Sequence, residues 1–394
     1  MYLYRLLYLS MGLPFGVIMS YIFPHLVGAM AMTEQKAGLV VAGTGAILAV
    51  AAPAWGFISD KLKNDRLVVA LIALLGVALS AVCVFVKDPA VIGIAVAVLA
   101  GLLYGGCEPI LGKLTNKFCM KYDKNLGTFR MFLSLGFFAS AVAGGFIAKA
   151  AGGSTFPVFW LGIVGGLIAF FIVFLVEDVP VSEIGLKEEK QGRVLDLLGN
   201  KAFLILFIIG VLGVGITAVV EQIFSYIVFA ENSGNIAFWG IAAATAGIIE
   251  AIITPFAGSG KGDKRFLILR IGLFYMVAEF LVMLFVPGQW GGLIARAMST
   301  GMYGYLLTAG ISVIAEIISP DLQGTAIGAY FGIGNGLGVS IFGIIGTMLL
   351  TSFGFTFTFV AFAILLFFAG TLLVSILKTL TNRQTDDKHM VQAE

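Results

Sequence analysis

Charged side chains are scarce in this chain of 394 residues: Asp, Glu, Lys and Arg together make up 12% of it, whereas hydrophobic residues make up 59%. A water-soluble domain cannot hide so many apolar side chains, because folding buries only part of the surface of a chain. The mean hydropathy of +1.03 agrees with this. The composition therefore predicts an integral membrane protein whose apolar surface faces a lipid bilayer.

Histidine and cysteine are also rare, with two and three residues respectively. Cys83, Cys107 and Cys119 lie in or near apolar runs without the spacing of a metal site, so we expect free thiols and no metal. The chain has no nucleophile–base constellation, and we do not expect an enzyme or a bound cofactor. The net charge of +2, with no cationic cluster on a soluble face, gives no reason to expect a nucleic-acid partner.

Apolar runs are what the chain has in abundance. A helix that crosses a bilayer needs about 20 apolar residues, and twelve runs qualify. We expect helices at 3–30, 36–58, 67–86, 90–118, 126–150, 156–177, 202–229, 236–257, 264–286, 290–318, 322–350 and 355–378. The first run lacks a polar region and a cleavage site, so it is interpreted as a span rather than a signal peptide.

A long polar segment separates the sixth run from the seventh. It predicts an N-terminal six-helix bundle over 1–178, a cytoplasmic linker over 179–200, a C-terminal six-helix bundle over 201–378 and a cytoplasmic tail over 379–394. The tetrapeptides Pro53-Ala-Trp-Gly56 and Pro255-Phe-Ala-Gly258 lie 202 residues apart, each at the end of an expected helix and before a basic loop. This weak repeat indicates a duplication, as is found in transporters.

Lysine and arginine are distributed unevenly between the two sides of the expected spans. Of the 24 cations, 18 fall on one side and only Lys36, Lys87 and Lys149 on the other. The positive-inside rule then places both termini and the linker in the cytoplasm. We expect a multi-pass protein of a bacterial plasma (inner) membrane.

The loop between the second and third expected helices concentrates charge in the segment PAWGFISDKLKNDR. We expect gating residues here, namely Gly56, Asp60, Lys61 and Arg66. A glycine allows two helices to approach closely, and Asp60 could face the N-terminus of a neighbouring helix, where the backbone dipole favours an anion. The segment therefore predicts a gate on one side of the membrane.

The same segment resembles the signature loop of the major facilitator superfamily, although Lys63 replaces its usual second glycine. Other segments resemble the lactose-permease-like branch of oligosaccharide and nucleoside proton symporters: FRMFLSLGFFASAVAGGFI with Arg130, VVEQIFSY with Glu221, AGIIEAIITPFAG with Glu250 and LILRIG with Arg270. The resemblance implies an all-α fold of twelve transmembrane helices in two pseudo-symmetric six-helix bundles. It also implies that Arg130 contacts sugar hydroxyls.

The chain departs from that branch at several positions. Gly112 stands where lactose permease has a glutamate, and Glu108 is the expected substitute. Phe137 replaces a tryptophan that stacks on a sugar ring. The histidine and glutamate that couple protons become roughly Ser299 and Met302. These changes put lactose itself, and that form of the proton relay, in doubt.

Several ionisable residues fall within the expected helices, where each charge costs about 3 kcal/mol or more. The set is Glu108, Arg130, Glu221, Glu250, Arg270, Glu279, Arg296 and, marginally, Glu316. Residues equidistant from a tight turn lie at similar depth. This predicts three pairs, which are Glu108–Arg130, Glu250–Arg270 and Glu279–Arg296. Each pair is either a structural link or part of a functional site.

Glu221 has no cation at matching depth in its own hairpins. A carboxylate without a partner in an apolar environment can take up a proton, so we expect Glu221 to carry a proton or to accept a hydrogen bond from the solute. The alternative is that it faces the outer water layer. Glu250 could also take up a proton, with Arg270 adjusting how readily it does so, or the two residues could form an ion pair in the core. The expected substrate-binding set is Glu108, Arg130, Phe137, Glu221 and Glu250, and the expected proton-coupling set is Glu221, Glu250 and Arg270.

The sequence as a whole predicts a monomeric secondary active transporter for proton-coupled symport of a small polar solute. A sugar or oligosaccharide is the first choice. Transport would draw on a proton gradient, because the chain contains no nucleotide-binding domain. The alternatives are a nucleoside or an organic (aromatic) acid, or export of a drug or metabolite. A more distant alternative is a membrane receptor or scaffold that transports nothing.

Overall fold

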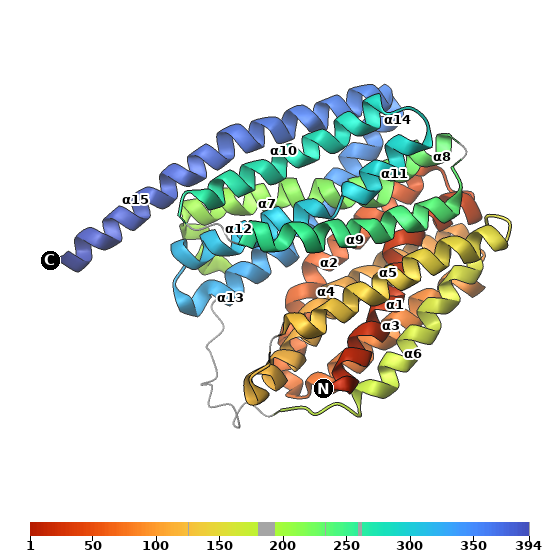
Figure 1. Ribbon diagram of the computed structural model, residues 1–394, viewed down its shortest axis with the longest axis horizontal. Coiled ribbons are helices and arrows are strands. Elements are labelled where there is room, and N and C mark those ends of the chain that lie inside the picture. Colours follow the sequence, from red (N-terminus) through yellow and green to blue (C-terminus); the bar gives the residue numbers. More distant parts are fainter. Residues whose placement is uncertain (125, 180–193, 233, 259–261, 394) are drawn as a thin grey trace. The chain divides into compact units, whose positions relative to one another are not determined.

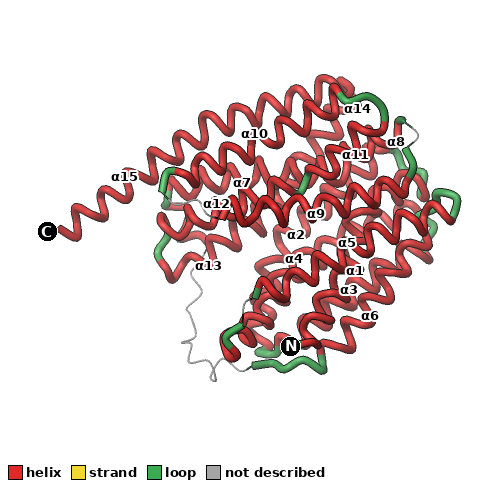
Figure 2. Tube along the Cα trace, viewed as in Figure 1, coloured by secondary structure: helices red, strands yellow, loops and turns green. Residues whose placement is uncertain are grey.

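Capping side chains and apolar runs together determine where the helices begin. The computed structural model describes residues 1–124, 126–179, 194–232, 234–258 and 262–393. Asn64 accepts a hydrogen bond from the Leu67 amide at 3.0 Å, and Asn200 accepts one from the Phe203 amide at 3.0 Å. Asp88 accepts from two amides of the first turn that follows it. Such caps satisfy amides that have no partner within the helix. Figure 2 shows helices joined by short loops throughout the described residues.

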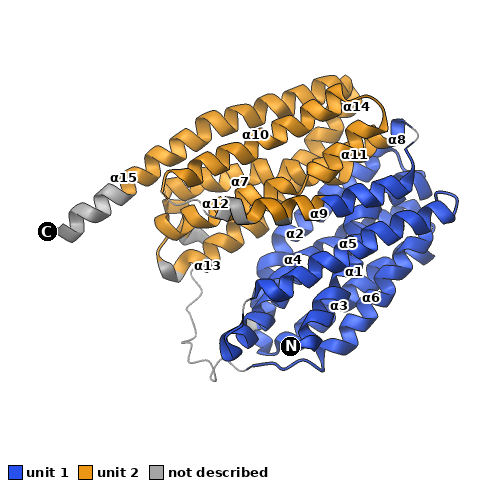
Figure 3. Cartoon of the chain, in the orientation of Figure 1, with its two compact units in different colours: residues 1–188, 230–245 blue, residues 189–229, 246–394 orange. Residues whose placement is uncertain are grey.

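Contacts divide the chain into two compact units (Figure 3), of which unit 1 comprises residues 1–188 and 230–245. Its helices are α1 (Tyr2–Pro24) with the π-helical η1 (His25–Ala29), α2 (Glu34–Leu62), α3 (Asp65–Phe85), α4 (Pro89–Tyr122), α5 (Gly127–Ala150) and, after a 3-10 turn, α6 (Phe159–Val173). In this bundle α1 packs against α5 and α6, α3 packs against α4 and α6, and α2 packs against α4 (Figure 1).

Unit 2 comprises residues 189–229 and 246–394. Its described elements are η4 (Val194–Gly199), α7 (Lys201–Val219), η5 (Val220–Phe224), α8 (Ser225–Glu231, which ends in unit 1), α9 (Ile236–Gly258, which begins in unit 1), α10 (Lys264–Phe285), α11 (Gln289–Met298), α12 (Gly301–Ile317), α13 (Pro320–Gly328), η6 (Ala329–Ile333), α14 (Gly334–Phe368), η7 (Ala369–Leu373) and α15 (Val374–Ala393). The stretch after residue 378, expected as a tail, continues as helix to Ala393.

The described segments account for twelve spans. Ten helical segments are long and apolar enough to cross a membrane, and one of them, from Thr325 to Gln384, runs for 60 residues and counts as two spans. That long segment divides at Gly354, whose φ of 76° and ψ of −178° are not helical. The expected helix 290–318 is broken at Ser299 and Thr300 into α11 and α12, and together these supply the remaining span.

The two units repeat the same helix pairing. In unit 1, α1 crosses α5 where a Cβ added to Gly136 would lie 2.2 Å from Leu9 O and 2.9 Å from the Cα of Gly12. In unit 2, α7 crosses α14 where a Cβ added to Gly215 would lie 2.2 Å from the Cα of Gly338. Gly12 and Gly215 lie 203 residues apart, and Gly136 and Gly338 lie 202 residues apart. These values match the repeat seen in the sequence, so the bundles are pseudo-symmetric.

One helix contributes to both units. The first part of α9, up to Thr245, belongs to unit 1, where Trp239 Nε1 donates to Ser20 O at 2.8 Å. Gly240 lies against α5, since a Cβ there would be 2.3 Å from Ala141 O. The remainder of α9 belongs to unit 2 and packs around Gly304 through Ile253 and Thr254.

Candidate functional site

The predicted pair between Glu108 and Arg130 is present in unit 1. Arg130 Nη2 on α5 donates to Glu108 Oε2 on α4 at 2.7 Å. The two side chains are 51% and 34% exposed, respectively, so the protein does not enclose them. An arginine–carboxylate pair that remains accessible offers both hydrogen-bond donors and acceptors to a small molecule.

Aromatic side chains adjoin this pair. Tyr104 lies one turn before Glu108 on α4, and Phe137 lies two turns after Arg130 on α5, so each shares a face with its charged neighbour. Phe15 on α1 joins them, with its ring centroid 5.4 Å from that of Tyr104 and 6.5 Å from that of Phe137. All three rings are half-buried. The charged pair and the aromatic trio therefore form one mixed surface within unit 1.

Unit 2 contains an enclosed ion pair that the sequence did not predict. Glu221 and Arg296 are 1% and 0% exposed, and Glu221 Oε1 lies 3.0 Å from Arg296 Nη1. The same nitrogen donates to Ser299 Oγ at 3.1 Å. The prediction that Glu221 has no cationic partner is therefore wrong, because its partner Arg296 lies on a span that is not adjacent in sequence. The pair joins the seventh span to the tenth.

A local change of helix type accompanies Glu221. The amide of Ser225 bonds to Val220 O, five residues back, rather than to Glu221 O. This π turn inserts one extra residue into the helix, a feature that is frequent at functional sites. The hydroxyl of Ser225 also donates to Val220 O at 2.7 Å.

Glu279 on α10 does not pair with Arg296, so that prediction is wrong. The side chain is fully buried, and among the described residues neither carboxylate oxygen has a hydrogen-bond partner. Glu279 lies near enough to Glu221 for the two carboxylates to interact electrostatically. Helix rotation, which the spacing of charges leaves open, directs Arg296 toward Glu221 instead.

Arg270 is held by the last span. Its Nε donates to Gly370 O and its Nη2 to Ser375 Oγ, both at 3.0 Å. The amide of Val374 bonds to Ala369 O in the π-helical η7, which leaves Gly370 O available to Arg270. Within the described part of the chain Arg270 does not pair with Glu250, so that predicted pair is wrong. Glu250 itself lies half-buried on α9.

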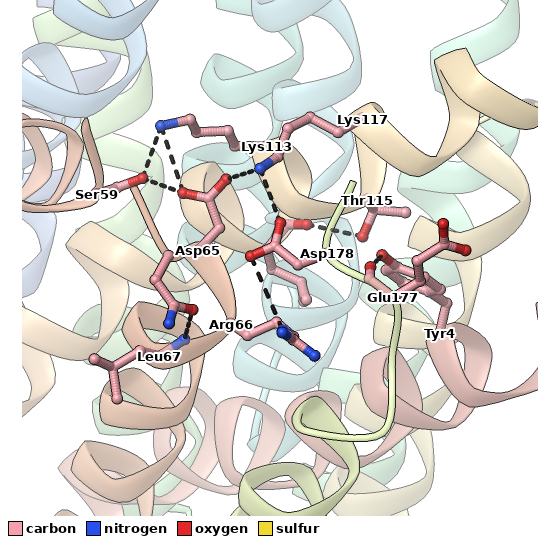
Figure 4. A network of polar contacts seen from close by, with 12 residues as sticks. Tyr4, Ser59, Asp65, Arg66, Leu67, Lys113, Thr115, Lys117, Glu177 and Asp178 are labelled. Carbon is pink, nitrogen blue, oxygen red and sulfur yellow. Dashed lines mark hydrogen bonds and ion pairs between the residues drawn. The ribbon is translucent and has the colours of Figure 1, made fainter. Parts of the chain in front are cut away.

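A network of charged side chains lies where α2 ends and α3 begins (Figure 4). Its centre is Asp65, which is 2% exposed and accepts from Ser59 Oγ at 2.5 Å. Lys117 Nζ on α4 lies 2.8 Å from Asp65 Oδ2 and 2.9 Å from Asp178 Oδ1. Lys113 Nζ lies 3.5 Å from Asp65 Oδ1. This network ties α2, α3, α4 and the end of α6 together.

The expected gating residues relate to this network unequally. Arg66 belongs to it, with Nη1 donating to Val176 O at 3.3 Å and Nε 4.0 Å from Asp178 Oδ2. Lys61 is exposed, and the side chain of Asp60 lies outside the described residues. No described atom lies within 4 Å of a Cβ added to Gly56, so the close helix approach expected there is not found. The aspartate at a helix N-terminus is Asp65, because α3 begins two residues before the expected start at 67.

No group of three or more His, Cys, Asp or Glu side chains suited to a metal ion occurs among the described residues. The site chemistry described above therefore consists of ion pairs, unpaired carboxylate oxygens and aromatic faces.

Comparison with known proteins agrees with the arrangement of helices. Residues 6–289 match the model of the Major Facilitator Superfamily. The uncharacterized transporter YwbF of Bacillus subtilis (strain 168) is 23% identical over 346 residues, which cover 84% of this chain and 82% of that protein.

Solved structures share the fold at low sequence identity. The nucleoside transporter NupG superposes with a TM-score of 0.76 at 15% identity, covering 96% of this chain and 99% of its own. A D-xylose-proton symporter superposes with a TM-score of 0.70 at 13% identity, covering 94% of this chain and 95% of its own. A POT family transporter in complex with 5-aminolevulinic acid superposes with a TM-score of 0.75 at 12% identity, covering 96% of this chain and 96% of its own. These likenesses establish the fold of twelve spans in two six-helix bundles.

Proposed function

Because the chain belongs to the Major Facilitator Superfamily and is a multi-pass membrane transporter, we propose that it is a secondary active transporter in which protons drive the symport of a small polar solute. The superfamily fold supports a cycle in which two bundles expose a central site to each face of the membrane in turn. In this proposal a sugar or oligosaccharide is the solute.

The observation that carries the proposal is the mixed surface of unit 1, formed by Glu108, Arg130 and the trio Phe15, Tyr104 and Phe137. A guanidinium presents donors in a planar fork, and a carboxylate accepts, so together they can satisfy the hydroxyls of a sugar. An aromatic face packs against the apolar C–H face of a sugar ring. Binding sites of this kind combine apolar walls with a few well-placed polar groups.

A solute that binds here competes with an ion pair already formed. Arg130 and Glu108 satisfy each other at 2.7 Å in the absence of solute, so the free site keeps its charges paired. An exposed pair contributes roughly 0–1 kcal/mol, which a few solute hydrogen bonds can replace. An organic acid would instead need Arg130 freed from Glu108. The pair thus favours a neutral polyol over an anion.

A nucleoside is the second candidate, and the aromatic trio favours it. A nucleobase can stack on a half-buried ring, while its ribose hydroxyls bond to the charged pair. The likeness of the fold to NupG, a nucleoside transporter, is compatible with this candidate. An exporter of drugs or metabolites, or a receptor that transports nothing, has no comparable support in the described site.

Purified protein in liposomes tests the proposal directly. A pH-sensitive dye inside the vesicles would report proton entry on addition of hexoses, pentoses, disaccharides or nucleosides. We expect one class to cause solute-dependent alkalinisation of the outer medium and acidification inside. The proposal fails if labelled solute enters without protons, or if no solute of any class moves protons.

Orientation follows from the uneven distribution of cations, with 18 on one side and three on the other. We propose that both termini face the cytoplasm of a bacterial cell. A single cysteine placed near residue 390 should react with an impermeant maleimide only after the cells are opened. Labelling of intact cells would reverse the assignment.

A further inference from the structure

Three ionisable side chains are enclosed together in unit 2. Glu221, Glu279 and Arg296 are 1%, 0% and 0% exposed. Arg296 is paired with Glu221, and Glu279 lies near enough to Glu221 for the two carboxyl groups to interact electrostatically. If all three were ionised, the enclosed group would carry a net charge of −1 with no contact to water.

The single guanidinium is directed to one of the two carboxylates. Arg296 Nη1 lies 3.0 Å from Glu221 Oε1 and donates to Ser299 Oγ at 3.1 Å. Glu279 has no such partner: within the described residues both of its carboxylate oxygens lack a hydrogen bond. A carboxylate buried without a hydrogen bond or counter-ion is far less stable than the neutral acid.

The elements packed around α10 supply no described second cation for Glu279. On α10 itself Tyr275 donates to Met298 O at 3.1 Å, while Arg270 bonds to the last span. Tyr305 on α12 lies beside Tyr275, with ring centroids 5.9 Å apart. At the other end of the bundle Arg265 pairs with Glu316, and Lys378 pairs with Asp263. α14 carries no ionisable side chain, and in α7 the only one is Lys201 at its first residue.

A cluster of aromatic rings adjoins the same helix turns. Phe280 follows Glu279 on α10, and Phe224 lies in the same π turn as Glu221, with Phe359 and Phe362 from α14 against both. The Phe224–Phe359 centroids are 5.4 Å apart and the Phe280–Phe362 centroids 5.9 Å. The residues next to Glu221 and Glu279 along these two helices thus include apolar rings that pack on one another.

We propose that Glu279 is a proton-binding site, whose carboxyl group holds one proton while Arg296 is paired with Glu221. In this arrangement the enclosed group is neutral: one acid, one carboxylate and one guanidinium. When Arg296 turns from Glu221 to Glu279, the proton moves from Glu279 to Glu221, from which it can later be released to water that reaches the cluster. The cluster thus has two arrangements of equal charge that differ in where the proton resides.

The link between this proton and solute movement rests on the proposed function. The location of the proton does not rest on the proposed function, because it follows from the burial and pairing of the three side chains. The two statements can therefore be tested separately.

Infrared spectroscopy of the purified full-length protein, without solute, tests the location. An un-ionised carboxyl group buried from water gives a C=O stretching band that shifts in heavy water. We expect such a band in the wild type at pH 7 and its loss in Glu279→Gln. The matched control Glu177→Gln removes an exposed carboxylate and should leave the band unchanged. A band that persists unaltered in Glu279→Gln would overturn the proposal.

A second variant tests the sharing of Arg296. In Glu221→Gln only one carboxyl group remains beside the guanidinium, so Glu279 should ionise against Arg296 and the band should disappear although Glu279 is present. Persistence of the band in Glu221→Gln would show that Arg296 does not control the proton, and would overturn that part of the proposal. Glutamine matches the shape of the neutral acid, so Glu279→Gln should unfold at the temperature of the wild type, which verifies that the variant is folded.

Liposomes then separate this inference from the proposed function. Glu279→Gln should lose at least tenfold in solute-dependent proton uptake, while counterflow of labelled solute stays within threefold of the wild type. Wild-type vesicles in which no solute moves protons would defeat the proposed function, and the infrared band would still locate the proton. Proton uptake by Glu279→Gln at the wild-type rate would overturn the coupling role of Glu279.

Discussion

The two units pack their helices alike but treat their charged side chains differently. The same close glycine contact joins α1 to α5 through Gly12 and Gly136, and α7 to α14 through Gly215 and Gly338. Yet the ion pair of unit 1 at Arg130 is half exposed, whereas that of unit 2 at Arg296 is fully enclosed. The two units thus share the contacts that fix the helices, whereas their charged side chains differ. In the two proposals above, unit 1 binds the solute and unit 2 holds the proton.

The largest contrast should appear when the arginines are removed. Arg296→Met leaves Glu221 buried without its cation and should destabilise the protein by about 3–5 kcal/mol, whereas Arg130→Met should cost less than about 1 kcal/mol because its partner is accessible to water. Thermal and denaturant unfolding in detergent would measure both.

A second substitution shows whether this cost comes from the uncompensated charge. The double variant Glu221→Gln, Arg296→Met should recover most of the loss, since no buried charge is left unpaired at that position. Equal destabilisation by Arg296→Met and Arg130→Met would remove the contrast between the units.

The shared glycine contacts predict a matched effect in both units. Gly136→Ala and Gly338→Ala should each cost about 1–3 kcal/mol, because the new methyl group would meet backbone atoms that cannot move aside. Gly112→Ala and Gly247→Ala are the controls, as their Cβ positions lie in open space among the described residues. Variants at Gly136 and Gly338 that unfold at the same temperature as these controls would show that the crossings tolerate side chains.

Arg130→Lys tests the binding role of unit 1. Lysine keeps the charge but loses the planar fork, so transport should fall at least tenfold, equivalent to about 1.4 kcal/mol. The temperature of unfolding should not change, because the side chain is half exposed. Initial rates of labelled solute uptake give the measurement, and full transport by Arg130→Lys would exclude the proposed contact.

The smallest effect is expected at Glu177, at the membrane surface of unit 1. Hydrogen bonds from Lys121 and Tyr122 hold the pKa of its carboxyl group below the ordinary value of 4.5. A carboxyl group with a lowered pKa stabilises the folded state above that ordinary value, and the contribution is lost as the pH falls through the lowered value. Because the side chain is exposed, the contribution is no more than about 0.5 kcal/mol.

Unfolding temperatures of the wild type and of Glu177→Gln should therefore differ slightly at pH 7 and converge below pH 4.5. A difference that grows on acidification would contradict the assignment of these hydrogen bonds.

Much of the fold was predictable because a bilayer requires long apolar runs, and these stand out in the sequence. The Glu108–Arg130 pair was predictable for a related reason: the two residues flank one short turn, so their depth is fixed by counting. The partners of Arg296 and Arg270 could not be predicted in this way. Each pairs with a span that is not its neighbour in sequence, and the π turns at Glu221 and Gly370 shift the register by one residue.

The network at Asp65 was missed for a different reason. Asn64 and Asp65 form an N-terminal cap and an acidic first turn, which is a recognisable start signal. The apolar run itself begins only at Leu67, so hydropathy alone leaves both residues in a loop. An earlier start would have identified Asp65 as the anion at the helix N-terminus.

Helix α9 has a mechanical consequence. The helix is continuous, yet it belongs to unit 1 up to Thr245 and to unit 2 beyond that residue. A hinge movement of one bundle against the other would therefore have to bend α9 at that point or break the hydrogen bond from Trp239 to Ser20. Its residues there are small, and the Thr245 hydroxyl bonds back to Ile241 O at 2.8 Å, an arrangement that bends helices. In the proposed transport cycle, bending of α9 would thus be concentrated in a single turn.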